Sequence, residues 1–201
     1  MKYMQYILWL VGLMLILGSL ATWSMQYIPR WFPEQGAMIM LNGFTPQVIR
    51  VQLALQTLSM FLIPAIVVYF MMLRSDSFGQ GLRGSIAVKG HLWGSLLAAG
   101  LSLLLLPTIS LLGAWNASLP LPEWSLRMER QAKFITDMIL MDSSWSAFAT
   151  NIVVCAFLPA LAEELFFRGV LQTIFVRTLR NPHVAIWIVA AVFSFFHFLV
   201  P

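Results

Sequence analysis

The segment "LAEELFFRGV", residues 161–170, places two carboxylates and a guanidinium in an otherwise apolar stretch. A charged side chain in such a stretch is costly, so each of Glu163, Glu164 and Arg168 needs either a partner or a function. Glu164 and Arg168 are four residues apart with the acid first, the favourable order for an ion pair on a helix. We therefore expect Glu164 and Arg168 to form a pair that is buried between helices.

Glu163 has no such partner on its own helix, because its neighbours at i+3 and i+4 are Phe166 and Phe167. It points about 100° away from Glu164 around the helix axis. A desolvated carboxylate that lacks a fixed cation suits the role of a general base. Glu163 is therefore the first candidate for a catalytic residue.

His197 lies on the next apolar segment, after a turn marked by Asn181 and Pro182. Glu163 and His197 are symmetric about position 180, so each lies roughly 20–25 Å along its helix from the turn. Two antiparallel helices joined by a short turn would bring both side chains to the same depth. The spacing predicts that Glu163 and His197 face each other. The alternative for His197 is a packed histidine bonded to a backbone carbonyl.

Composition indicates the solvent that surrounds these residues. The chain is 60% hydrophobic and 10% charged, whereas a soluble domain carries about 25% charged residues. Lipid is the solvent that such a chain fits, so we predict a multi-pass integral membrane protein, most simply of a bacterial cytoplasmic membrane. The net charge of +4 is spread out and suits lipid headgroups. It forms no basic patch that would bind nucleic acid.

Apolar runs and connections predict an all-α, polytopic transmembrane bundle of about five spanning helices. The runs cover residues 7–25, 51–73, 92–115, 145–176 and 184–201. Residues 120–143 alternate apolar and charged side chains at helical spacing and predict an amphipathic helix in the membrane interface. We expect one membrane-embedded domain over residues 1–201, with its motif-bearing core at 145–201. The first run, with small residues Ser19 and Ala21, could instead be a cleaved signal peptide.

Basic residues predict the orientation of the chain. An N-terminus inside the cell places six basic residues on the cytoplasmic side and five outside. The cytoplasmic six are Lys2, Arg74, Arg83, Lys89, Arg177 and Arg180, and the outer five are Arg30, Arg50, Arg127, Arg130 and Lys133. We therefore expect the N-terminus and the turn near residue 180 to be cytoplasmic.

Two motifs resemble a known family. "EELFFR", from Glu163 to Arg168, is similar to the E-E-x-x-x-R motif of the CPBP intramembrane glutamic endopeptidases, and "FSFFH", from Phe193 to His197, is similar to their F-x-x-x-H motif. This family includes the type II CAAX prenyl endopeptidases and the Abi proteins. The family carries a third motif, H-x-x-x-N, on a later helix. Because the sequence ends at Pro201 inside a hydrophobic run, we expect further C-terminal helices beyond it.

The resemblance implies an intramembrane endopeptidase that cleaves a lipidated or membrane-associated peptide near its C-terminus. It implies that Glu163 activates a water, that His197 assists, and that Glu164 and Arg168 organise the site, with Phe167 and Phe193 lining the substrate cavity. We expect no metal, although two glutamates and a histidine could contribute to a zinc site. A bacteriocin immunity or membrane binding protein without turnover is the alternative function, and a transporter or proton relay is a third.

Overall fold

The computed structural model describes residues 3–27, 45–74, 92–118, 120 and 122–199. This part of the chain is helical and contains no strand, which confirms the prediction of an all-α membrane bundle. The α-helices are α1 (Met4–Ser24), α4 (Pro46–Thr57), α5 (Ile63–Arg74), α7 (Leu92–Ala117), α8 (Glu123–Leu140), α9 (Trp145–Asn151), α10 (Leu158–Glu163), α11 (Gln172–Leu179) and α12 (Pro182–Leu199). A 3₁₀ turn, η1 (Met25–Tyr27), and three π-helical segments, η2 (Leu58–Leu62), η3 (Ile152–Phe157) and η4 (Glu164–Leu171), connect or continue them.

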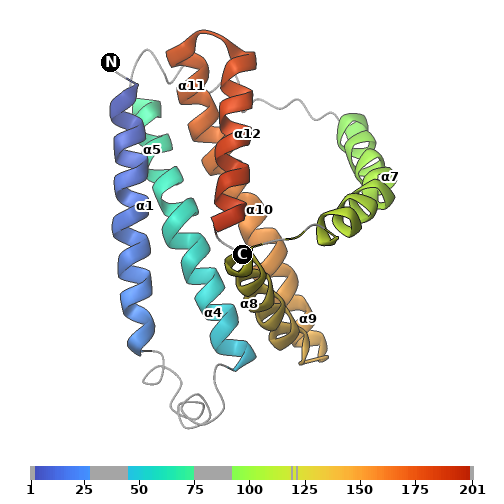
Figure 1. Cartoon of the computed structure of the whole chain (residues 1–201). Helices are drawn as coiled ribbons and strands as arrows, with labels where there is room; N and C mark the ends of the chain where they lie inside the picture. The colour runs from blue at the N-terminus through green and yellow to red at the C-terminus, as the bar shows by residue number, and fades with distance from the viewer. Residues whose placement is uncertain (1–2, 28–44, 75–91, 119, 121, 200–201) are drawn as a thin grey trace.

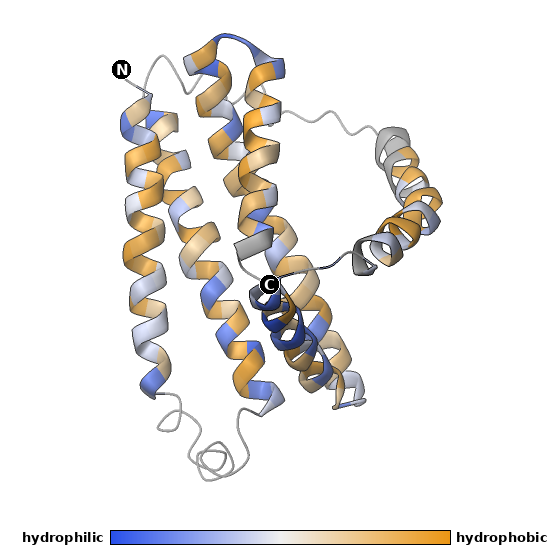
Figure 2. Cartoon of the chain, in the orientation of Figure 1, coloured by the Kyte–Doolittle hydropathy of each residue, from blue (hydrophilic) through white to orange (hydrophobic). Residues whose placement is uncertain are grey.

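Three continuous helical rods in the described residues are long and apolar enough to cross a membrane. They cover Met4–Tyr27, Pro46–Arg74 and Trp145–Leu179. The other two predicted spans form shorter apolar helices, Gly100–Trp115 and Pro182–His197. Hydrophobic residues dominate the long rods along most of their length, as Figure 2 shows.

Two of the rods change from π- to α-helical geometry at a proline. Pro64 follows η2, and Pro159 follows η3. A proline has no N–H, and its ring clashes with the carbonyl four residues earlier, so a wider turn before it relieves both problems. Pro64 and Pro159 therefore shape spanning helices and do not end them.

The hydrophobic core joins the N-terminal helices to the motif-bearing ones. Its buried members are Tyr6, Leu10 and Met14 of α1, Ala65, Val68 and Met72 of α5, Phe166, Phe167, Val170 and Leu171 of η4, Ile174 of α11, and Val189 of α12. In Figure 1, α1 and α5 stand beside α11 and α12 in the upper half of the molecule. The candidate residues of η4 are thus anchored by buried side chains on the same segment.

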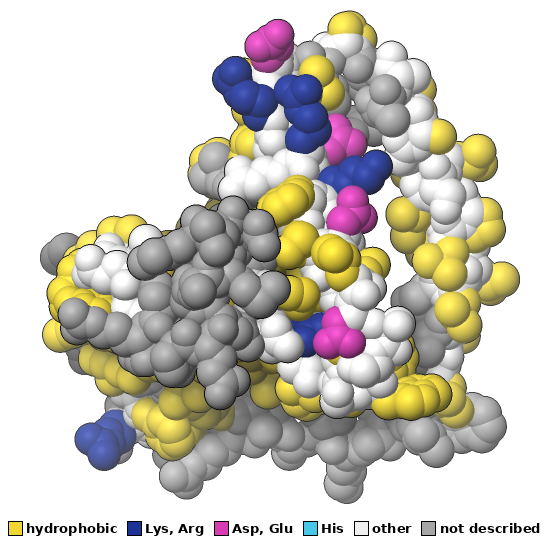
Figure 3. All heavy atoms as spheres, turned by 90° about the horizontal axis from the view of Figure 1, so that it is seen from below, with side chains coloured by type: hydrophobic (Ala, Val, Ile, Leu, Met, Phe, Trp, Pro, Cys, Tyr) yellow, Lys and Arg dark blue, Asp and Glu magenta, His cyan; other side chains and the backbone are white. Residues whose placement is uncertain are grey.

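Helix α8 lies across the lower end of the bundle, as expected for an interfacial helix (Figure 1). Its apolar side faces α4, where Ile139 is buried and Met128, Ile135 and Met138 are half-buried. Its charged side chains are exposed, and Figure 3 shows acidic and basic groups gathered on the face seen from below. This division between apolar and charged sides suits a helix in the plane of the headgroups.

Helix α7 stands to one side of the other helices (Figure 1). The side chains from Leu101 to Trp115 are exposed all around the helix axis. A helix that is apolar on every side fits a lipid environment. Its sequence therefore predicts a membrane segment, but its place in the structure is outside the packed core.

A tight turn returns the chain from α11 to α12. Arg180 adopts the left-handed conformation with φ 54°, and its N–H donates to the carbonyl of Val176. The Asn181 side-chain oxygen accepts hydrogen bonds from the N–H groups of His183 and Val184 and so caps α12. Because the turn is this short, α11 and α12 run antiparallel and in contact. Residues equally far from the turn, such as Glu163 and His197, therefore lie at similar depths.

The arrangement makes the predicted topology testable. The start of α1 and the α11–α12 turn lie at the upper end in Figure 1, whereas α8 lies at the lower end. The assignment of the upper end to the cytoplasm rests partly on residues outside the described part of the chain, namely Lys2, Arg83 and Lys89. In a Cys155→Ser background, we expect His183→Cys and Ser143→Cys to be labelled from opposite sides of the membrane, His183→Cys from the cytoplasm. Labelling of both from one side would contradict the bundle's orientation.

Candidate active site

The structure brings Glu163 and His197 together, as their spacing predicts. Glu163 lies at the end of α10, and its Oε1 is 3.7 Å from Nε2 of His197 on α12. The two residues are 34 positions apart along the chain. Their side chains are 28% and 51% exposed, so both remain accessible. A separation of 3.7 Å is too long for a direct hydrogen bond and allows one water to contact both groups.

Phe193 holds the imidazole of His197 from the same helix. The Nδ1 atom of His197 lies 3.1 Å from the carbonyl oxygen of Phe193, and the two rings are 4.1 Å apart at an angle of 35°. A carbonyl can only accept a hydrogen bond, so Nδ1 carries the proton in this contact. Nε2 of a neutral His197 is then an acceptor that points toward Glu163. The backbone bond proposed as the alternative for His197 is present together with the contact to Glu163.

A cavity of about 410 Å³ adjoins these residues between α10, η4, α11 and α12. Glu163, Glu164, Arg168 and Gln172 supply its polar lining. Its apolar lining consists of Ala160, Phe167, Ile186, Val189, Ala190 and Phe193. Phe167 and Phe193 therefore line this cavity, and their contact with a substrate stays a prediction.

Glu164 and Arg168 form the predicted ion pair, but the expectation that it is buried is wrong. Arg168 Nη1 lies 2.8 Å from Glu164 Oε2, and the side chains are 72% and 60% exposed. Both belong to η4 and line the cavity. Their helix turns them toward this open space, because its opposite side carries the buried Phe166 and Val170. The pair is a feature of the cavity wall and not of the protein interior.

This exposure lowers the expected structural cost of removing Arg168. A pair that is open to solvent contributes about 0–1 kcal/mol, so Arg168→Ala should reduce the free energy of unfolding by no more than about 1 kcal/mol. Arg127→Ala, which breaks the exposed pair with Glu123 on α8, is a matched control. Unfolding in mixed micelles measures both variants. A loss of about 3–5 kcal/mol for Arg168→Ala would instead indicate a buried pair.

An aromatic contact links the site to the second spanning segment. The ring of Phe61, in η2, lies 5.2 Å from Phe166, 5.9 Å from Phe167 and 6.0 Å from Phe196. Phe167 also packs edge-to-face on Phe193, at 5.0 Å. Edge-to-face packing of this kind fixes the positions of the rings. Sequence reasoning missed Phe61, since an aromatic residue in an apolar run gives no sign of its long-range partner.

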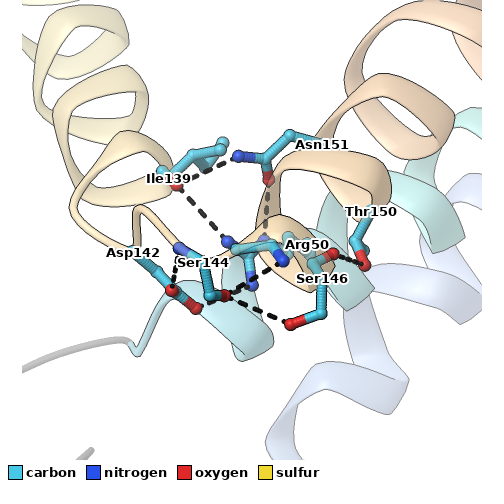
Figure 4. Close-up of polar contacts among 8 residues, drawn as sticks. Arg50, Ile139, Asp142, Ser144, Ser146, Thr150 and Asn151 are labelled. Carbon is cyan, nitrogen blue, oxygen red and sulfur yellow. Dashed lines mark hydrogen bonds and ion pairs between the residues drawn. The ribbon is translucent and has the colours of Figure 1, made fainter.

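Sequence reasoning also missed a polar cluster at the lower end of the bundle, shown in Figure 4. Arg50 of α4 is buried; its Nε donates to Oδ1 of Asn151 at 2.8 Å and its Nη2 to the carbonyl of Ile139 at 3.4 Å. Asn151 Nδ2 donates to the same carbonyl, and Asp142 lies 3.9 Å from Arg50 Nη1. This Arg50 cluster ties α4 to α8 and α9. Its sequence signal was a polar Asn151 inside an apolar run.

Asp142 is held ionised in this cluster. Hydrogen bonds from the Ser144 side chain and backbone N–H, with a smaller contribution from the charge of Arg50, lower the pKa of Asp142 below its usual value. A lowered carboxyl pKa contributes stability at neutral pH that is lost as the pH falls through it. The Asp142 carboxylate is therefore available to Arg50 at neutral pH.

A metal was a second option for the site. Among the residues that the structure describes, no group of three or more His, Cys, Asp or Glu side chains is gathered closely enough to hold a metal ion. Glu163 and His197 face each other, but the third donor, Glu164, is paired with Arg168. The donor set is thus a poor fit to a zinc site, which takes three or four protein ligands.

Comparison with known proteins locates a family within the chain. A family model described as "Type II CAAX prenyl endopeptidase Rce1-like" matches residues 145–201, which include α9 to α12 and both motifs. No curated protein and no solved structure matches the chain. The apolar helices thus indicate a membrane protein, and its segment 145–201, which contains Glu163, Glu164, Arg168 and His197, is similar to the Rce1-like family of CAAX-type proteases.

Proposed function

We propose that the site cleaves a peptide bond near the C-terminus of a lipidated or membrane-associated protein, with a water activated by Glu163. The contact between Glu163 Oε1 and His197 Nε2 beside an open cavity is the observation that carries this proposal. Peptide hydrolysis needs a base for the attacking water and a proton for the departing amine. We propose that Glu163 performs both tasks while His197 orients the water.

The proposed reaction uses one water held between the two side chains. A water between them gives one hydrogen bond to Glu163 and one to Nε2 of His197, which leaves an oxygen lone pair for the scissile carbonyl carbon. Glu163 takes the first proton as the new C–O bond forms. The protonated Glu163 then returns that proton to the amine as the C–N bond breaks, which restores the carboxylate. His197 orients the water, and Phe193 orients His197.

Glu164 and Arg168 have a supporting role in this proposal. The guanidinium keeps the Glu164 carboxylate turned along the wall of η4 and away from Glu163. Donors for the oxyanion would come from the family's third motif, which residues 1–201 do not contain. No step requires a metal, so we propose that a chelator leaves turnover unchanged.

The test is a peptidase assay with the full-length protein in liposomes. A farnesylated peptide ending in Cys-Val-Ile-Met and its unlipidated form are incubated with the protein, and mass spectrometry identifies the new ends. We expect loss of the C-terminal residues from the lipidated peptide, with or without chelator. Binding of the peptide without cleavage would favour the immunity or binding function. Loss of cleavage on chelation with recovery on zinc would overturn the metal-free mechanism.

A further inference from the structure

Gln172 is the one polar residue in the described lining of the cavity that the proposed reaction does not use. It opens α11, lies eight residues after Glu164 and lines the same cavity as Glu164 and Arg168. Its side chain is half-buried. Within the described residues, Glu163 contacts His197, and Glu164 is paired with Arg168, but the Gln172 amide has no bonded partner. A polar side chain without a partner is costly in a membrane span, so a ligand that forms hydrogen bonds with it is stabilised there.

The part of the cavity wall that α12 forms is apolar, in contrast to the polar groups near Gln172. Ile186, Val189, Ala190 and Phe193 of α12 line it at helical spacing, i, i+3, i+4 and i+7. One side of the cavity therefore offers polar groups along η4 and α11, and the other side offers an apolar surface. An extended peptide has the same division, because its main chain is polar and its side chains can be apolar.

The length of the cavity suits a short peptide. From Glu163 to Gln172 the wall advances nine residues, which is about 13 Å along a helix. An extended chain covers 3.3 Å per residue, so about four residues fit between these two positions. A peptide unit presents one N–H and one C=O, and a glutamine amide can accept from the first and donate to the second.

The charge of the segment gives the peptide a direction. Residues 165–201 contain Arg168, Arg177 and Arg180 but no Asp or Glu. Arg177 and Arg180 lie beyond Gln172, toward the α11–α12 turn. A C-terminal carboxylate is therefore attracted to the Gln172 end of the cavity, while Glu163, which has no paired cation among the described residues, repels it from the other end.

We propose that Gln172 is a substrate-positioning residue: its side-chain amide bonds the main chain of the residues C-terminal to the cleaved bond. This inference rests on the proposed function and adds the direction in which the substrate lies. Main-chain bonds of this kind do not select side chains, so Gln172 contributes to affinity for many C-terminal sequences.

Equilibrium binding tests the contact without turnover. The full-length protein with Glu163→Gln is placed in nanodiscs and titrated with the farnesylated, fluorescent peptide ending in Cys-Val-Ile-Met. Adding Gln172→Met, which keeps the length of the side chain but removes its donors and acceptor, should weaken binding roughly three- to tenfold, the effect of one hydrogen bond. Gln52→Met is the matched control, since Gln52 lines a separate cavity between α1 and α4.

A modified peptide probes the same contact on an unchanged protein. N-methylation of the last peptide bond removes its N–H, and we expect a similar loss of affinity when Gln172 is present and no further loss with Gln172→Met. Equal affinities for Gln172 and Gln172→Met, or fully additive losses, would overturn the inference while leaving the proposed function intact. Failure of the parent protein both to bind and to cleave the peptide would overturn both.

Discussion

Replacing Glu163 by glutamine is expected to slow peptide cleavage by roughly 10²–10⁴-fold, the usual contribution of a general base. Glutamine keeps the shape of the side chain but cannot take a proton from water. The structure gives the replacement little reason to disturb folding, because Glu163 is partly exposed and its Oε1 lies 3.7 Å from Nε2 of His197, beyond direct hydrogen-bond distance. Initial rates in liposomes, together with protein levels and unfolding in detergent, measure the effect.

His197→Ala is expected to lower the rate by a comparable factor, because the water would lose its second contact. Groups that act as a unit are not additive, so the double variant should be little slower than either single variant. Glu129→Gln on α8 and His183→Ala at the start of α12 make the same chemical changes on exposed residues outside the site, and both should retain full activity. Normal turnover by Glu163→Gln would end the glutamate mechanism.

Arg50→Ala should produce a large loss of stability, because it removes the centre of a buried polar cluster. Arg50 is 6% exposed and bonds both Asn151 and the carbonyl of Ile139. Hydrogen bonds to a charged group contribute about 1.5–3 kcal/mol, so we expect the free energy of unfolding to fall by about 2–3 kcal/mol. Unfolding in mixed micelles measures the fall, and limited proteolysis should show α8 cleaved more readily.

Asp142→Ala provides the matched comparison for Arg50→Ala. The Asp142 side chain is 36% exposed and lies 3.9 Å from Arg50, so its removal should cost much less stability than the removal of Arg50. The loss of stability caused by Arg50→Lys should lie between the losses for these two variants. An ammonium keeps the charge but does not hold two acceptors in the fixed geometry of a planar guanidinium. If Arg50→Ala and Asp142→Ala unfold alike, the cluster does not hold α8 in place.

Structural features that depend on residues close together in the sequence could be predicted from the sequence. The spans follow from runs of apolar residues, and the Glu164–Arg168 pair follows from a spacing of four on one helix. The contact between Glu163 and His197 could also be predicted, although they are distant in sequence. A short turn forces two antiparallel helices into register, so depth depends only on counting residues from Asn181.

The tertiary structure decided the features that depend on contacts between distant segments. Arg50 meets Asn151 across 101 positions, and Phe61 meets Phe167 across a comparable separation. Hydrophobic periodicity indicates which side of a helix is buried. It does not identify the residue that this side meets, because many residues on other helices are compatible with the same pattern. The same limit explains the error about Glu164 and Arg168. Local spacing determined that they pair, but only the packing of η4 against α5 and α12 decided that the pair faces an open cavity.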